Sequence, residues 1–190
     1  MPLEGERVLL REIREEDLEM FVRLRNDLAT QAWSRTLPPD YTTEMIRRRY
    51  WDRDFSYRRE HGIFVVELKE DGSRAGMVTY SEVVDRMEAM WGVAIDQRHW
   101  GTGIAHDAGD TLLHFLFEEL GLRVVRLYTQ TENERAVAAF RKLGFREAVR
   151  TPNAVFKAGR HADNLAMDLL REEWYSLHGL TDRLIDPFLP

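Results

Sequence analysis

A glycine-punctuated turn, placed between an apolar run and an amphipathic pattern, is the segment best suited to chemistry. It reads Arg98-His99-Trp100-Gly101-Thr102-Gly103. The preceding run, 90–95, predicts a buried strand, and from Thr102 onward apolar residues recur at helical spacing. The glycines therefore lie at a strand-to-helix junction, where free N–H groups and the helix dipole favour an anion. The spacing predicts a phosphate-binding turn.

Composition narrows the class of protein. The chain has 190 residues, is 44% hydrophobic and 32% charged, and carries a net charge of −6. This is typical of an ordered chain with one core, so we expect a single domain over 1–190. The negative charge argues against nucleic-acid binding. The absence of cysteine removes disulfides, thiolate metal ligands and a cysteine nucleophile.

The sequence shows no pattern that predicts membrane insertion or export. No apolar run approaches about eighteen residues, the length that spans a bilayer. The N-terminal residues show neither a signal peptide nor a transit pattern. We therefore expect a cytoplasmic protein.

The expected elements alternate between strands and helices. Apolar runs predict strands, and apolar residues at helical spacing, bracketed by caps and glycines, predict helices. Their order predicts one mixed α/β sheet flanked by helices. The strands are expected at 8–13, 63–68, 75–84, 90–95, 124–129, from 145 onward and at 165–170, and the helices at 15–28, 42–51, 102–120 and 133–143.

Two further patterns follow the turn. Asn133 to Ala136 is followed by Phe140-Arg141-Lys142-Leu143-Gly144-Phe145, and Gly159, Asp163 and Met167 precede Glu173-Trp174. With these blocks in this order, the chain resembles the GNAT acetyltransferases, and within them the RimJ/RimL-like group, from Val8 to Trp174. Rival nucleotide motifs fit poorly, because His106 replaces a third Rossmann glycine and no Gly-Lys-Ser/Thr follows the turn.

The resemblance implies a fold and a cofactor. The implied GNAT fold is α/β (α+β), a single mixed, mostly antiparallel sheet of about seven strands flanked by about four helices, with a C-terminal tail at 175–190. Acetyl-CoA would bind without a metal, its pantetheine arm beside the backbones of Val93 and Ile95, and Asn133 and Phe140 would face it. A homodimer is also implied. The pyrophosphate would be held by the backbone N–H groups of Arg98, His99, Gly101, Thr102, Gly103 and Ile104.

The reaction implied is direct attack of an amine on the thioester, with the oxyanion held by an N–H of the Val93 segment. Many relatives carry the basic carboxylate where this chain has Met90. Period-two alternation puts Glu88 on the face of Met90, so Glu88 is the first candidate base and Glu82 the second.

The proton donor for the departing thiolate is left open. The family's tyrosine position is Phe140, which cannot donate a proton. Ser81, Tyr80, Tyr128 or water are the alternatives, and the sequence does not choose among them.

The acceptor is expected to be a primary amine, possibly a protein N-terminus. A small-molecule amine, either a polyamine or an aminoglycoside, is the alternative within the enzyme class. The two departures at Met90 and Phe140 also suit a non-catalytic CoA-binding sensor module.

A histidine pattern lies on the helix after the turn. His106, Asp110 and His114 recur every four residues, as metal ligands on one helix face would. This face is roughly opposite the stripe of Ile104, Ala108 and Leu112. The pattern therefore predicts a solvated surface, and no metal site is expected.

Overall fold

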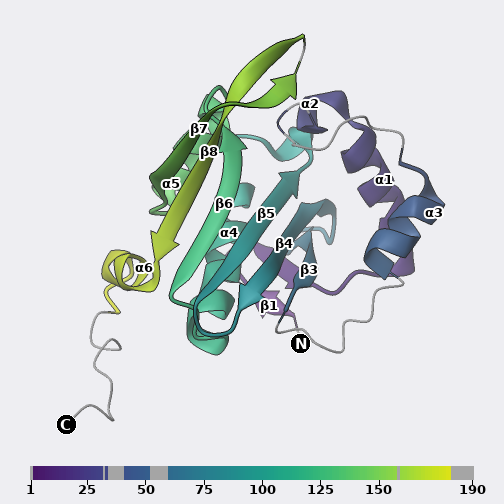
Figure 1. Cartoon of the computed structure of the whole chain (residues 1–190). Helices are drawn as coiled ribbons and strands as arrows, with labels where there is room; N and C mark the ends of the chain where they lie inside the picture. Colours follow the sequence, from purple (N-terminus) through teal and green to yellow (C-terminus); the bar gives the residue numbers. More distant parts are fainter. Residues whose placement is uncertain (1, 32, 34–40, 52–59, 158, 181–190) are drawn as a thin grey trace.

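The computed structural model describes residues 2–31, 33, 41–51, 60–157 and 159–180. These residues form one sheet in the order β1-β2-β3-β4-β5-β6-β8-β7 (Figure 1). Every neighbouring pair is antiparallel except β5 and β6, which are parallel. The predicted mixed, mostly antiparallel sheet is confirmed. The strands are β1 Leu3–Glu4, β2 Val8–Arg11, β3 Gly62–Leu68, β4 Arg74–Val84, β5 Glu88–Ile95, β6 Val124–Gln130, β7 Arg146–Lys157 and β8 Arg160–Leu170.

Two of the predicted helical ranges, 42–51 and 102–120, are confirmed almost to their ends, because π-helical segments at Arg47–Trp51 and Phe115–Glu119 continue the α-helices there. The helix expected over 15–28 ends at Asn26, because the backbone of Asp27 is extended. A second short helix begins at Leu28, and 69% of the surface of the Leu28 residue is exposed. Thr42 caps the next helix as expected, its side chain accepting from the Met45 N–H. The described α-helices are α1 Leu18–Asn26, α2 Leu28–Gln31, α3 Thr43–Ile46, α4 Ile104–His114, α5 Glu134–Lys142 and α6 Arg171–Leu177.

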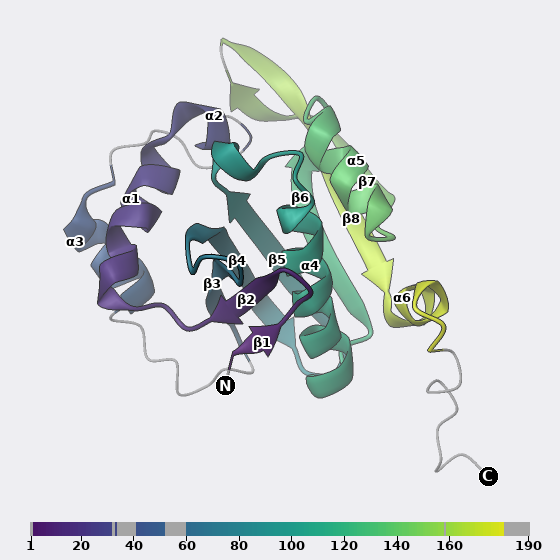
Figure 2. The same ribbon diagram turned by 180° about the vertical axis from the view of Figure 1, so that it is seen from behind.

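The two faces of the sheet are covered differently. On one face α4 packs its apolar stripe against β5 and β6, and Figure 2 shows it lying across these strands. Ala89 and Trp91 of β5 belong to that core. The other face carries a smaller core, in which α1 and α3 pack on Val65 and Met77. In Figure 1 none of the described helices crosses in front of β5 and β6 on this side of the sheet.

Close packing fixes α4 to the sheet and to the N-terminal strands. A Cβ on Gly109 would come within 2.9 Å of Trp91 and Leu143, so only glycine lets α4 approach this closely. Two residues earlier, the Asp107 carboxylate accepts hydrogen bonds from the backbone N–H groups of Glu6, Arg7 and Val8. The start of α4 is therefore held by hydrogen bonds from the N-terminal backbone at 6–8 and by side-chain packing around Gly109.

None of the helices in the described part of the chain is long and apolar enough to cross a membrane.

Candidate active site

The strands β5 and β6 separate partway along their length. Their parallel ladder joins only Glu88–Met90 to 124–126, yet β5 continues to Ile95 and β6 to Gln130. Beyond Met90, β5 stays paired with β4 on one side and has no ladder partner on the other among the described residues. Figure 1 shows the two strands diverging. An extended ligand could pair with the free edge of β5.

The glycine turn (98–104) lies at the end of β5 where the strands have separated. Gly101 and Gly103 have φ of +76° and +88°, values that favour glycine. Gly103 is the N-cap of α4. In the described part of the chain, the N–H groups of Gly101, Gly103 and Ile104 have no acceptor, whereas the N–H groups of Arg98, His99 and Thr102, also predicted to hold the pyrophosphate, already donate within the turn. These free donors at a helix N-terminus fit an anion such as a pyrophosphate.

The space beside these glycines is open. A Cβ at Gly101 would meet no atom within 4 Å, and one at Gly103 would meet only Arg7 Nη1 at 3.6 Å. Glycine is therefore required here by the backbone conformation rather than by protein packing. The unfilled space leaves room for a ligand to reach the backbone.

Three side chains fix the turn to its surroundings. Arg7 Nη1 donates to the Thr102 carbonyl at 2.7 Å. Arg135 of α5 lies 3.3 Å from the centre of the Trp100 ring, and burial there lowers the pKa of Arg135. The Trp100 indole N–H donates to the Ile95 carbonyl at 2.8 Å. Because the Ile95 carbonyl already accepts this hydrogen bond, it is a less suitable partner for the pantetheine arm. The backbone of Val93 is therefore the better candidate for that pairing.

Asp96 organises the start of the turn. Its carboxylate accepts from the Arg98 backbone N–H at 3.1 Å and from the Arg98 guanidinium, and it forms an ion pair with Arg23 of α1 at 3.0 Å. The hydrogen bond from Arg98 lowers the pKa of Asp96 to about 2. Gln97 donates to both carboxylate oxygens of Asp27 at 2.8 Å. The turn is thus connected to α1 and α2. Sequence analysis missed Asp96, although an Asp directly before a turn is a capping signal.

Two residues expected to face the cofactor have other contacts. Asn133 caps α5, its side chain accepting from the Ala136 N–H at 3.4 Å and donating to Thr129 at 3.3 Å. Phe140 is 8% exposed and packs edge-on against Trp91, with ring centres 5.4 Å apart. Both side chains therefore shape the elements around the opening.

Trp91 supplies a polar atom without a partner. It is the first β5 residue beyond the parallel ladder and is 4% exposed. Its indole N–H has no hydrogen-bond partner in the described structure. A buried donor of this kind is costly unless something binds it. The Trp91 side chain belongs to the core on the α4 side and packs against Phe140 and Phe145, so this donor is an unsatisfied polar atom of that core.

The open face of the sheet beside the ladder is called here the acceptor face. Glu88 lies on it with Met90, as the alternation predicted, and Ser81 of β4 is directly opposite Met90. Glu88 forms an ion pair with Arg126 at 3.5 Å, and Asp168 receives two hydrogen bonds from the same guanidinium at 2.8 Å. The acceptor face comprises Ser81, Glu88, Met90, Arg126, Tyr128 and Asp168.

The structure separates the two tyrosines left open by the sequence. Tyr128 lies on the acceptor face and is 41% exposed. Tyr80 is 1% exposed and packs against Phe64 and Phe115 in the core on the α4 side. The Tyr80 side chain therefore lies in the core and not on the acceptor face.

Glu82 occupies a strained position. It is an exposed residue in the irregularity between Ser81 and Val84, where the register of β4 against β5 shifts. Its φ of +54° is uncommon for a residue other than glycine. Such strain is concentrated at functional sites.

A polar hollow lies at the opposite end of α4, far along the chain from the glycine turn. Its lining includes Asp85, Arg86, Glu118 and Arg171. It contains none of the predicted site residues.

The fold and the free donors at the turn define an acyltransferase that binds a CoA thioester. A family model described as acetyltransferase (GNAT) domain matches residues 7–146. The chain belongs to the GNAT acetyltransferase family. It is an acetyl-CoA-dependent N-acetyltransferase, and the transfer requires no metal.

Individual relatives show the same similarity. The chain is 27% identical over 173 residues to the spermidine N(1)-acetyltransferase of Escherichia coli, covering 90% of each chain. It is 30% identical over 151 residues to the putative ribosomal N-acetyltransferase YdaF of Bacillus subtilis, covering 78% of this chain and 75% of the relative.

Solved structures share the fold. A spermidine N-acetyltransferase from Vibrio cholerae in complex with CoA and spermine has a TM-score of 0.80 at 23% identity, covering 90% of this chain and 99% of the other. The ribosomal-protein-S5-alanine acetyltransferase from Vibrio fischeri has a TM-score of 0.78 at 19% identity, covering 92% and 98%.

Proposed function

We propose that this N-acetyltransferase acts on the primary amine of a polyamine bound at the acceptor face. The observation that carries the proposal is the end of the β5–β6 ladder at Met90, beyond which the strands separate, next to the paired residues Glu88 and Asp168. Arg126 binds both carboxylates, so the pair retains one net negative charge. The whole chain carries a net charge of −6, which attracts cations over a longer range. A relative that covers 90% of both chains is named a spermidine acetyltransferase.

Cofactor binding is assigned to backbone groups. The N–H groups of Gly101, Gly103 and Ile104 bind the pyrophosphate, and Val93 pairs with the pantetheine arm along the free edge of β5. Acetyl-CoA supplies an activated thioester in this position. An N–H of the Val93 segment holds the negative charge that develops on the carbonyl oxygen.

The base that takes the proton from the ammonium is assigned to Glu82 ahead of Glu88. Glu88 forms an ion pair with Arg126 at 3.5 Å, so its carboxylate is already engaged with a guanidinium. Glu82 is exposed and has no ion pair among the described residues. The strained backbone at Glu82 also supports placing Glu82 ahead of Glu88 as the base.

The proton for the departing sulfur is assigned to Tyr128. It lies on the acceptor face, and its hydroxyl is a donor of the type found at the family position that Phe140 occupies here. Ser81, opposite Met90 on the neighbouring strand, is the alternative donor.

A protein N-terminus is the second candidate acceptor. The relative with 30% identity is named a putative ribosomal N-acetyltransferase, which favours it. The two acceptors differ in what lies beyond the amine. A polyamine repeats its charge along an apolar chain, whereas a peptide presents backbone amides. A homodimer and a cytoplasmic location remain part of the proposal.

The test follows CoA release from acetyl-CoA with a thiol-reactive dye. The chain has no cysteine, so it contributes no background. Spermidine, N-terminal peptides and an aminoglycoside are compared at matched concentrations. We expect kcat/KM for spermidine to exceed that for any peptide by at least about tenfold, a difference of about 1.4 kcal/mol in transition-state binding. A peptide preference would replace the polyamine by the second candidate. Acetyl-CoA binding without release in any pool would support the sensor module.

A further inference from the structure

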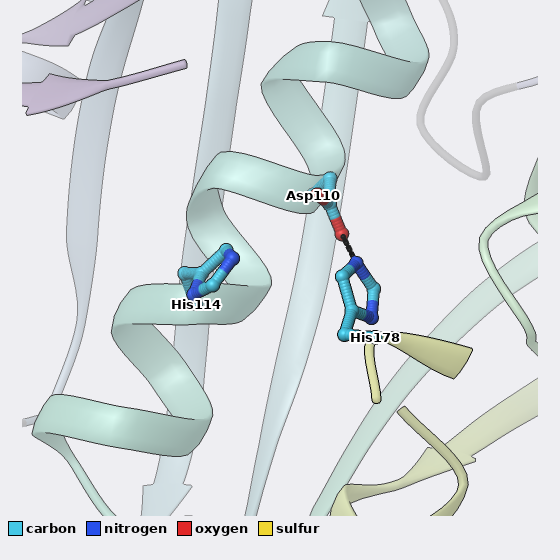
Figure 3. Close-up of side chains that lie close together, drawn as sticks. All are labelled: Asp110, His114 and His178. Atoms are coloured by element: carbon cyan, nitrogen blue, oxygen red, sulfur yellow. Dashed lines mark ion pairs between the residues drawn. The ribbon is translucent and has the colours of Figure 1, made fainter. Parts of the chain in front are cut away.

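Three ligand-type side chains meet between α4 and the end of α6. Asp110 and His114 lie one turn apart on α4, and His178 follows α6. One potential ligand atom from each lies within 4.8 Å of the others. Figure 3 shows Asp110 reaching from α4 to the His178 ring, with His114 one turn further along α4. The sequence pattern had grouped Asp110 and His114 with His106 instead.

The hydrogen bonds of His178 point to a ligand. Its Nδ1 lies 2.8 Å from the Trp174 carbonyl, which only accepts, so Nδ1 carries a proton. A neutral ring has one N–H, and Nε2 then presents its lone pair to the Asp110 carboxylate 3.0 Å away. Two electron-rich atoms at this distance need a cation between them, either a second proton on the ring or a metal ion.

We propose that Asp110, His114 and His178 bind a divalent transition-metal ion, with Zn²⁺ as the representative. Imidazole and carboxylate are the ligands that Zn²⁺, Ni²⁺ and Co²⁺ prefer when thiolates are absent. The histidine N–H bonded to a backbone carbonyl is the usual support of a metal-binding imidazole. The Trp174 indole N–H donates to Asp110 at 3.1 Å and orients the carboxylate in the same way.

The geometry needs only a small adjustment. Tetrahedral Zn²⁺ with bonds of about 2.0–2.1 Å places its ligand atoms about 3.3 Å apart. Asp110 and His178 are already close to this separation at 3.0 Å. His114 is exposed and contacts the Trp174 ring, and its ligand atom lies within 4.8 Å of those of Asp110 and His178, so it must move closer to bind the same ion. Water completes the coordination.

The ion would hold α6 against α4 and take no part in acetyl transfer. Asp110 is seven residues beyond Gly103 along α4, about 10 Å from the glycine turn by helical rise. The Trp174 side chain is fully buried beneath the cluster. The proposal therefore concerns the docking of the C-terminal helix, and it does not depend on the identity of the acceptor.

The experiment measures binding of Zn²⁺ alone to the full-length, untagged protein after treatment with a chelator. Titration in competition with a chromophoric chelator gives affinity and stoichiometry. We expect one equivalent of Zn²⁺ to bind. In His114→Ala and in His178→Ala the affinity falls at least about tenfold. His114→Ala removes no hydrogen bond seen among the described residues, so it tests the ligand even if loss of His178 loosens α6.

The matched control is His106→Ala, which removes an imidazole from α4 one turn before Asp110 but outside the cluster. It should keep the full affinity. Zn²⁺ should also raise Tm in the wild type and the control, and not in the other two variants, because the ion binds only the folded cluster. Absence of stoichiometric binding, or equal affinity in all four proteins, would overturn the proposal and leave a protonated His178 paired with Asp110.

Discussion

The glycine turn and the acceptor face lie at opposite ends of β5, and they are built in different ways. The turn is made by residues adjacent in the sequence, which bind one another and the start of α4. The acceptor face is made by four strands, β4, β5, β6 and β8, and Arg126 joins two of its carboxylates, Glu88 and Asp168. The difference teaches that the cofactor end of this enzyme is a local motif, whereas the acceptor end depends on tertiary pairing.

Loss of the proposed base, Glu82, has the largest expected effect. We expect Glu82→Gln to lower kcat about a hundredfold with little change in the KM for acetyl-CoA, because only proton removal is lost. Glu88→Gln should cost less, since Arg126 already pairs with that carboxylate. Steady-state kinetics against both substrates make the comparison. If both variants keep the wild-type kcat, neither carboxylate is the base.

Two tyrosine variants test the proposed proton donor at the acceptor face. Tyr128→Phe should lower kcat about tenfold, with water replacing part of the lost proton donor. Tyr80→Phe is the matched control, because it deletes the same hydroxyl from the opposite, buried face. Tyr80→Phe should change the free energy of unfolding and leave kcat unchanged. Equal kcat values for Tyr128→Phe and the wild type would move the donor role to Ser81 or water.

At the turn, Asp96→Asn should weaken cofactor binding severalfold. The amide cannot hold Arg23 and Arg98 as the carboxylate does, so the turn loses its anchor to α1. We also expect a loss of about 1–2 kcal/mol in unfolding free energy. Calorimetric titration with acetyl-CoA and chemical denaturation measure the two effects. Glu70→Gln, in an exposed hairpin turn, serves as the control and should show neither.

The smallest expected effect is the acid dependence of Asp96. Its pKa of about 2 in the folded chain is below the ordinary 3.8, so the charged form stabilises the fold above about pH 4. That contribution, about 1–2 kcal/mol, is lost as the pH falls toward 2. Denaturation of the wild type and Asp96→Asn between about pH 5 and pH 3 should show their stability difference narrowing. A constant difference would contradict the assigned pKa.

The sequence predicted the turn well because its determinants are local. Positive φ at Gly101 and Gly103 and the change from strand to helix are visible as glycines between two hydrophobic periods. The mixed sheet followed from the order of the elements. The end of the first helix at Asn26 was missed, because the apolar spacing continues to Leu28 although the backbone turns at Asp27.

The acceptor face could be predicted only in part. Alternation correctly placed Glu88 with Met90, since both lie on one strand. Arg126 and Asp168 are 42 residues apart and meet only because β6 pairs with β8, which no local pattern encodes. The bulge at Glu82 was missed for the same reason. It appears only when the register of β4 against β5 is known.

The central claim, that the glycine turn binds acetyl-CoA through its backbone, is tested most directly by calorimetric titration of two matched variants. Gly103→Leu and Gly121→Leu each place a side chain at a positive φ, of +88° and +65°, where no protein backbone lies within 4 Å. Both carry similar strain, but Gly121 lies beyond the far end of α4 from the turn. We predict that Gly103→Leu loses acetyl-CoA binding and Gly121→Leu retains the wild-type affinity. Equal affinity in the two variants would contradict the account.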